Sequence, residues 1–113
     1  MRGSMKINNK EVGLVANAAS PIIFRQLFHE DFLSEVNGAD SGKGLDLFQK
    51  MAFVMMKQAE TSEIKELMEL TIDEYYAWTV TLEPMDIMKN LGEIKKIYFG
   101  NTIKKSRPKK KAD

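Results

Sequence analysis

The sequence predicts a mainly α protein, a compact bundle of four to five helices preceded by a short N-terminal β-hairpin. Three observations support this fold class. The chain has 113 residues, which is enough for one domain with one core and too few for two ordinary domains. Apolar residues recur at helical spacing over most of the chain. Hydrophobic residues make up 43% and charged residues 29%, the composition of a globular domain.

The N-terminal residues predict a leader followed by a hairpin. Residues 1–4, MRGS, look like an expression-vector leader, so we expect Met5 to be the natural start and residues 5–101 to form the single helical domain. Residues 5–13, MKINNKEVG, have the pattern of a hairpin, because Asn8 and Asn9 tolerate the positive φ angles of a tight turn. A two-stranded hairpin is marginal alone, so it should pack against the helices.

The first helix is predicted to begin at Ser20, whose hydroxyl can cap it, with Pro21 in the first helical position. Three phenylalanines then recur every four residues along one face: Phe24, Phe28 and Phe32. This spacing indicates an amphipathic helix of about four turns. We expect it to end at residues 37–38, Asn-Gly, in a left-handed C-cap, and residues 37–44 to form a flexible loop.

The remaining sequence predicts further helices. Residues 45–59 are apolar on most sides, which indicates a central helix. A short helix should follow a cap at Thr61 or Ser62, and Thr71 and Glu74 have the spacing of a capping box that begins the next one. A last helix is predicted over residues 85–99, with Gly100-Asn101 as its stop. Its apolar stripe consists of Ile87, Leu91, Ile94 and Tyr98.

No pattern in the chain indicates catalysis. The chain has no cysteine, which removes thiol nucleophiles, disulfides and zinc–thiolate sites and fits a reducing cytosol. Its one histidine, His29, has acids at i+1, i+2 and i+6, and none of these shares its helix face as a metal site requires. Neither GxSxG nor a P-loop occurs. We therefore expect no enzyme activity, no cofactor, no metal, and a surface His29, with pH sensing or partner contact as the alternative.

Two groups of side chains could bind a partner. Flexible methionines on the central helix suit either the core or a face open to another chain: Met51, Met55 and Met56. Large aromatic residues further along could be core anchors or interface hot spots: Tyr75, Tyr76 and Trp78. The apolar runs are far shorter than the ~20 residues that span a bilayer, so we expect no membrane contact.

The end of the chain is basic. Residues 104–113 contain six basic residues and one acid, whereas the other residues contain 11 basic and 15 acidic ones. The basic residues are Lys104, Lys105, Arg107, Lys109, Lys110 and Lys111. We expect residues 102–113 to be a solvated, disordered tail, with docking to an acidic protein or to nucleic acid as alternatives. The absence of interleaved aromatic residues and the acidic body make nucleic acid the weaker of these two.

Three segments, in this order, resemble the tail assembly chaperones of siphophages, the phages with long non-contractile tails, of Gram-positive bacteria or their prophages. Residues 5–32 show a hairpin that leads into a Ser-Pro helix start with an Arg-Gln pair and a phenylalanine followed by acids. Residues 45–60 look like that family's central helix, and residues 72–84, IDEYYAWTVTLEP, like its acidic, aromatic-rich segment. Together the three segments cover most of residues 5–99.

The resemblance implies a non-enzymatic role in virion morphogenesis. Such a protein self-associates, in an open spiral, binds and solubilises the tape measure protein, and recruits the major tail (tube) protein. It works in the cytoplasm of the infected or lysogenic host and is absent from the finished virion. A programmed frameshift often gives a longer form, and Lys109–Lys111 is what an A-rich slippery site could encode. The alternatives are a small phage or bacterial regulator that binds nucleic acid through its basic tail and, less favoured, a small enzyme.

Overall fold

The computed structural model describes residues 1–100. Its elements are β1 (Arg2–Ile7), β2 (Lys10–Val15), α1 (Ser20–Phe28), α2 (Phe32–Asn37), α3 (Ser41–Glu60), α4 (Ile64–Met68), α5 (Ile72–Thr79) and α6 (Asp86–Phe99). The prediction of a mainly α fold with an N-terminal hairpin is confirmed. Within the described residues there are six helices rather than four or five, because the first predicted helix is divided in two.

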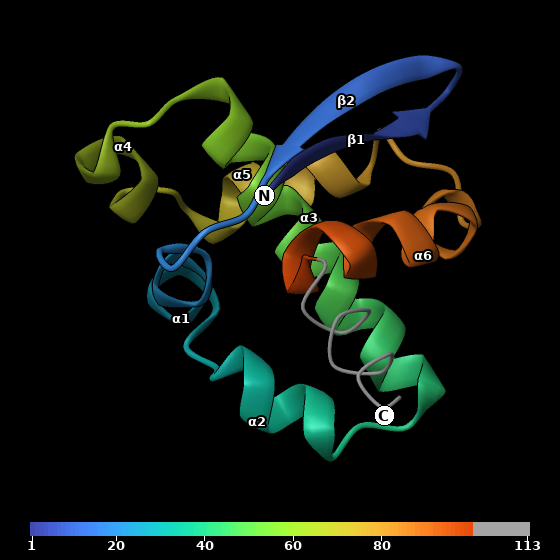
Figure 1. The fold of residues 1–113 in the computed structure, drawn as a ribbon, viewed down its shortest axis with the longest axis horizontal. Coiled ribbons are helices and arrows are strands. Elements are labelled where there is room, and N and C mark those ends of the chain that lie inside the picture. Colours follow the sequence, from blue (N-terminus) through green and yellow to red (C-terminus); the bar gives the residue numbers. More distant parts are fainter. Residues whose placement is uncertain (101–113) are drawn as a thin grey trace, which may run out of the picture.

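Helix α3 is the centre of the molecule. Figure 1 shows it in the middle, with α1 and α2 on one side and α6 on the other, and β2 packs directly on it. It is buried on several faces, which explains why its sequence is apolar on most sides. The helix begins at Ser41 rather than at the predicted residue 45, because Asp40 caps it by accepting a hydrogen bond from the Lys43 N–H at 2.9 Å. The preceding helix ends at Asn37 as predicted, but Gly38 has φ −100° and not the expected left-handed conformation.

The hairpin begins earlier than the sequence predicted. Asn8 and Asn9 form the turn with φ of 53° and 64°, as expected. The antiparallel pairing continues to Arg2 opposite Val15, so residues 2–4 extend β1 beyond the hairpin predicted for residues 5–13. Strand β1 also packs closely against α6: a Cβ on Gly3 would lie only 2.7 Å from Cδ1 of Ile97. Glycine at this position therefore lets the strand approach the helix.

The helix predicted to run without interruption from Ser20 breaks at His29. This residue adopts the left-handed conformation (φ 58°) and ends α1, and it is exposed, as expected of a surface histidine. Asp31 then caps α2 by accepting a hydrogen bond from the Ser34 N–H at 3.1 Å. The break allows the rings of Phe24 and Phe32 to meet in the core with centroids 5.1 Å apart.

Ser20 is a buried hydrogen-bonding residue and not the predicted helix cap. Ala19 holds the N-cap position and makes no side-chain cap, and Pro21 is the second residue of the helix rather than the predicted first. The Ser20 hydroxyl donates to Oε1 of Gln58 at 2.6 Å and accepts from the Asn17 N–H at 3.0 Å. These bonds join the start of α1 to the end of α3. In the described part of the chain, every buried side-chain N or O atom has a hydrogen-bond partner.

The later helices follow the sequence closely. Thr71 and Glu74 form the predicted capping box at the start of α5. Neither Thr61 nor Ser62 is the cap of α4, whose N-cap position is Glu63. Helix α6 ends before Gly100, which has φ 67°. Of its predicted stripe, Ile87 and Ile94 are buried and Leu91 and Tyr98 half-buried, and Ile97 is an additional core residue.

Aromatic rings in contact form a row through the core. Each successive pair of ring centroids is between 4.9 and 6.3 Å apart, and most pairs are tilted or edge-to-face. The row runs through Tyr76, Tyr75, Phe28, Phe24, Phe32, Phe48 and Phe99. It therefore links α5 to the C-terminal end of α6.

Candidate interaction surfaces

The predicted methionines lie mostly in the core. Met51 and Met55 are fully buried, because the hairpin, α1 and α6 surround this part of α3. They cannot form an exposed face in this structure, and of the two interpretations the core one applies to them. Met56 is half-buried and packs against both core clusters. The central helix is therefore a packing element and not a methionine-rich binding face.

The three aromatic candidates of α5 divide between core and surface. Tyr75 is buried, and its hydroxyl accepts a hydrogen bond from Nε2 of Gln49 at 3.0 Å. Burial raises the pKa of Tyr75 to about 12, because the phenolate would lose its hydration. Trp78 is half-buried, with its ring centroid 5.5 Å from that of Phe53. Tyr76 is exposed and is the one of the three that can contact a partner freely.

Tyr76 belongs to a row of exposed apolar side chains that we call the α5 stripe. Ile72 is 39% exposed, Tyr76 59% and Val80 83%. Ile72 and Tyr76 stand four residues apart on α5, and Val80, the C-cap residue, follows after four more with helical backbone angles (φ −71°, ψ −9°). The surrounding chain is acidic, since residues 60–86 contain eight acidic residues and a single lysine. The predictions included only Tyr76. The i, i+4, i+8 spacing of the stripe is visible in the sequence and could have identified the other two.

A second surface is a hollow between α2, α3 and α6, which we call the α3–α6 groove. Its volume is about 690 Å³, within the roughly 300–1,000 Å³ typical of ligand clefts. Its apolar lining consists of Val36, Ala39, Leu45, Phe48, Leu91 and Phe99. The sequence predicted Leu91 as core and did not single out the others as binding residues. Phe48 is buried and the other five are half-buried, and half-burial of this kind depends on how three helices meet, which the pattern of one helix does not reveal.

Two helical glycines line the groove without a packing reason. Gly44 is in the first turn of α3 and Gly92 is in the middle of α6. A Cβ placed on either would meet no heavy atom within 4 Å. Glycine in a helix interior costs about 0.5–1 kcal/mol relative to alanine. Both residues therefore leave bare backbone at the wall of the groove, where another chain can approach closely.

The rim of the groove is positively charged. Lys95 and Lys96 lie along it, and Nζ of Lys95 is 5.5 Å from the ring centroid of Phe48. Neither lysine has an acidic partner within 4 Å among residues 1–100. Asp40 also lines the groove, and its carboxylate is engaged by the Lys43 N–H. The groove thus offers apolar surface and two ammonium groups that have no acidic partner within the described part of the chain.

Residues 1–100 do not bring potential metal ligands together. No group of three or more histidine or acidic side chains there could hold a metal ion. His29 ends a helix and lies on the surface, as described above. None of the helices within residues 1–100 is both long and apolar enough to cross a bilayer. The predicted basic residues from Lys104 to Lys111 lie outside the described residues.

A second, smaller hollow beside the hairpin turn is polar. It lies between the turn and the start of α6, and its lining includes Lys6, Lys89 and Asn90. The Asn90 side chain bridges it, because Nδ2 donates to the Lys6 carbonyl at 2.9 Å and Oδ1 accepts from the Lys6 N–H at 3.1 Å. Its polar groups are therefore used to hold the hairpin to α6.

Comparison of the chain with protein-family models, with curated proteins and with solved structures found no match. The two apolar surfaces, their charges and the sequence resemblance are therefore the basis for inferring a function.

Proposed function

We propose that this protein is a tail assembly chaperone of long-tailed phages. In this proposal it binds and solubilises the tape measure protein, recruits the major tail (tube) protein, and is absent from the finished virion. The α3–α6 groove is the observation that carries the proposal, because an open apolar groove is the usual receptor for one face of an amphipathic helix. The three resembling segments supply the identity of the client.

The groove defines the kind of helix that it would accept. Its apolar lining suits large side chains repeated at i, i+3, i+4 and i+7 on the client. The bare backbone at Gly44 and Gly92 allows the client to approach closely. Lys95 and Lys96 can lay their aliphatic stems on the client's apolar flank while their ammonium groups reach acids beside it. The favoured client is therefore an amphipathic helix with acidic flanks.

The proposal includes three further features that the resemblance implies. Copies self-associate, the protein works in the cytoplasm of the infected or lysogenic bacterium, and a frameshift produces a longer form. The frameshift site would be encoded at Lys109–Lys111, outside the described residues. Reading the gene tests this feature, because a coding sequence without an A-rich heptamer there excludes it.

Co-expression with a tape measure fragment tests the proposed function. We expect the full chain to increase the soluble fraction of the fragment. A Gly92→Phe variant, whose ring enters the groove, should lose this effect. Met88→Phe is the matched control, because Met88 is an exposed residue of the same helix and does not line the groove. A fragment that stays insoluble with the wild-type chain, or an active Gly92→Phe variant, contradicts the proposal.

Nucleic-acid binding is the second candidate function. It is favoured by one observation, the six basic residues between positions 104 and 111. Deleting residues 104–113 and measuring DNA and RNA affinity over a range of salt concentrations separates the two functions. Strong binding that requires these residues and falls steeply with salt supports the regulator, and absence of binding supports the chaperone.

A further inference from the structure

We propose that the α3–α6 groove of one copy receives the α5 stripe of a second copy, so that the copies join head to tail. This inference rests on the self-association included in the proposed function, and it does not depend on the tape measure protein. It commits each of the two apolar surfaces to the other as its partner.

The two surfaces match in shape and chemistry. Ile72, Tyr76 and Val80 are exposed apolar side chains spaced four residues apart along α5 and its C-cap, and the groove has a mostly apolar lining. A helix needs close backbone approach to bury such a row fully, and the glycines at positions 44 and 92 provide it. Burial of both surfaces would remove Val80 from water, whose exposed fraction of 83% is the highest among the exposed large hydrophobic residues of the described part of the chain.

The charges of the two surfaces are complementary. The stripe lies within an acidic stretch, in which Asp73 follows directly after Ile72. The groove presents Lys95 and Lys96 at its rim. The chain's own residues 104–113 have the same sign of charge as this rim, which makes them a poor match for the groove. An acidic helix is therefore the better occupant, and every copy of this chain carries one.

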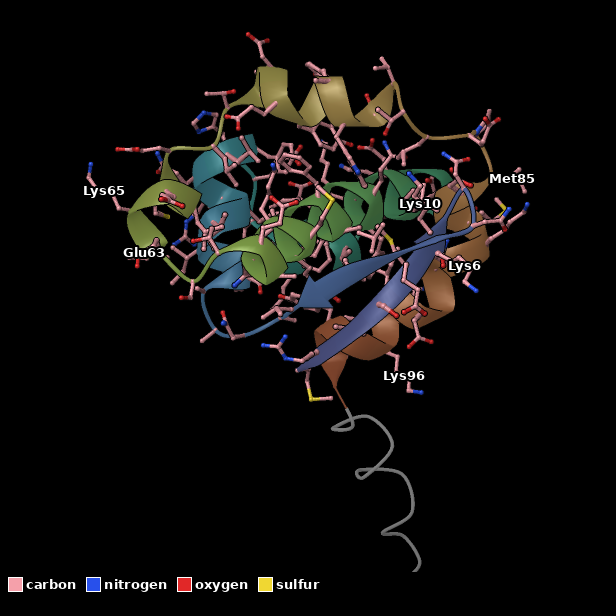
Figure 2. The ribbon with its side chains drawn as sticks, turned by 90° about the horizontal axis from the view of Figure 1, so that it is seen from above. Lys6, Lys10, Glu63, Lys65, Met85 and Lys96 are labelled. Atoms are coloured by element: carbon pink, nitrogen blue, oxygen red, sulfur yellow. The ribbon has the colours of Figure 1, made fainter. Side chains whose placement is uncertain are left out.

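The positions of the surfaces require two copies. Figure 2 shows α5 along one edge of the molecule and the C-terminal end of α6, with Lys96, at the opposite edge. The stripe of a copy therefore cannot reach the groove of the same copy. A contact between two different surfaces is heterologous, and its repetition extends a row of copies with one free groove and one free stripe at its ends.

The contact also sets a competition. A client helix with acidic flanks would use the groove that α5 of the neighbouring copy fills. Self-association should therefore decrease as client binds, so that free copies are held head to tail and separate as they load.

Two variants of the full chain test the contact by sedimentation velocity. The groove variant Lys95→Glu/Lys96→Glu keeps the stripe, and the stripe variant Tyr76→Lys/Val80→Lys keeps the groove. All four side chains are exposed, so circular dichroism should show wild-type helix content for both variants. The matched controls are Lys89→Glu and Met88→Lys, which make the same changes at exposed positions of α6 outside the groove.

We expect the wild type and both controls to form species that grow with concentration, and each variant alone to remain a monomer. An equimolar mixture of the two variants should form a 1:1 dimer and nothing larger, because only one intact groove and one intact stripe remain. A monomeric wild type, a variant that still self-associates, or a mixture that stays monomeric overturns the inference. If the wild-type chain fails to solubilise the client while the two variants still form the 1:1 dimer, the proposed function is contradicted and the contact between copies is not.

Discussion

Replacing Gly92 by alanine should make the protein more stable, which is unusual for a change inside a packed domain. Gly92 is the seventh of the 14 residues of α6, so it is well inside the helix. The new methyl group would have no heavy atom within 4 Å, so it cannot clash. Alanine is favoured over glycine in a helix interior by about 0.8–1 kcal/mol. We expect the free energy of unfolding to rise by about that amount.

The assay is thermal and urea unfolding followed by circular dichroism. A gain of about 1 kcal/mol corresponds to a rise in Tm of roughly 3–6 °C for a chain of 113 residues. The measurements belong at low micromolar concentration, because docking of a second copy would add stability that depends on concentration. Gly3→Ala is the matched control with the opposite expected sign. Its methyl group would lie within 3 Å of Ile97, which should cost about 1–3 kcal/mol.

If Gly92→Ala lowers the stability of the isolated chain, then the space beside Gly92 is filled in solution and the groove is not open. If Gly3→Ala raises stability, then β1 does not lie against α6 as the structure has it. A gain at Gly92 with a loss at Gly3 supports both the open groove and the close approach of the hairpin.

The remaining predictions concern the core and are measured by urea unfolding. Ser20→Ala should cost about 1–3 kcal/mol, because it leaves Oε1 of the buried Gln58 without its hydrogen-bond donor, and an unchanged stability would contradict the network. Met51→Ala should cost about 2–5 kcal/mol, because Met51 is fully buried. Tyr76→Ala should change the stability by less than about 0.5 kcal/mol, because Tyr76 is exposed. Equal effects of the two substitutions would contradict their different burial. Tyr75 releases its proton near pH 10 when unfolded and near 12 when folded, so the stability it contributes is complete below pH 10 and lost as the pH rises to 12. A Tyr75→Phe variant should show a smaller loss over that range, and an identical pH profile would refute the assignment.

Local signals in the sequence predicted the elements whose causes are local. The Asn8-Asn9 turn, the Thr71–Glu74 capping box and the stop at Gly100 each depend on a few neighbouring residues. The central helix was predictable because burial on several sides leaves an apolar sequence on several sides.

The break at His29 could not be predicted from spacing. Phenylalanines four residues apart fit a continuous helix as well as two short ones. What distinguishes them is a tertiary contact, since Phe32 packs edge-to-face on Phe48 and on Tyr98 of the last helix. The cap at Asp31 is compatible with the break, but such residues also occur inside helices.

The candidate surfaces were predicted in part. Tyr76 was among the candidate partner residues, and the structure exposes it, whereas Met51 and Met55 are core residues. The groove was missed because residues such as Leu45 and Leu91 look like core in the sequence, and nothing local shows that these half-buried side chains border a hollow. Gly92 was the available clue, because a glycine in the middle of a strongly periodic helix calls for a reason outside that helix.

The row of aromatic rings makes the protein a convenient optical sensor of its own surfaces. The row ends at Tyr76 on the α5 stripe and at Phe99 in the groove, and Trp78 lies beside it, 6.2 Å from Tyr75 between ring centroids. Trp78 is the only tryptophan of the chain, so light absorbed by the neighbouring tyrosines can be emitted from a single, known position. Its fluorescence should report contacts made by α5, and the near-ultraviolet circular dichroism of the rings should report whether the core between the two surfaces stays packed. Occupation of either surface could then be followed without an attached dye.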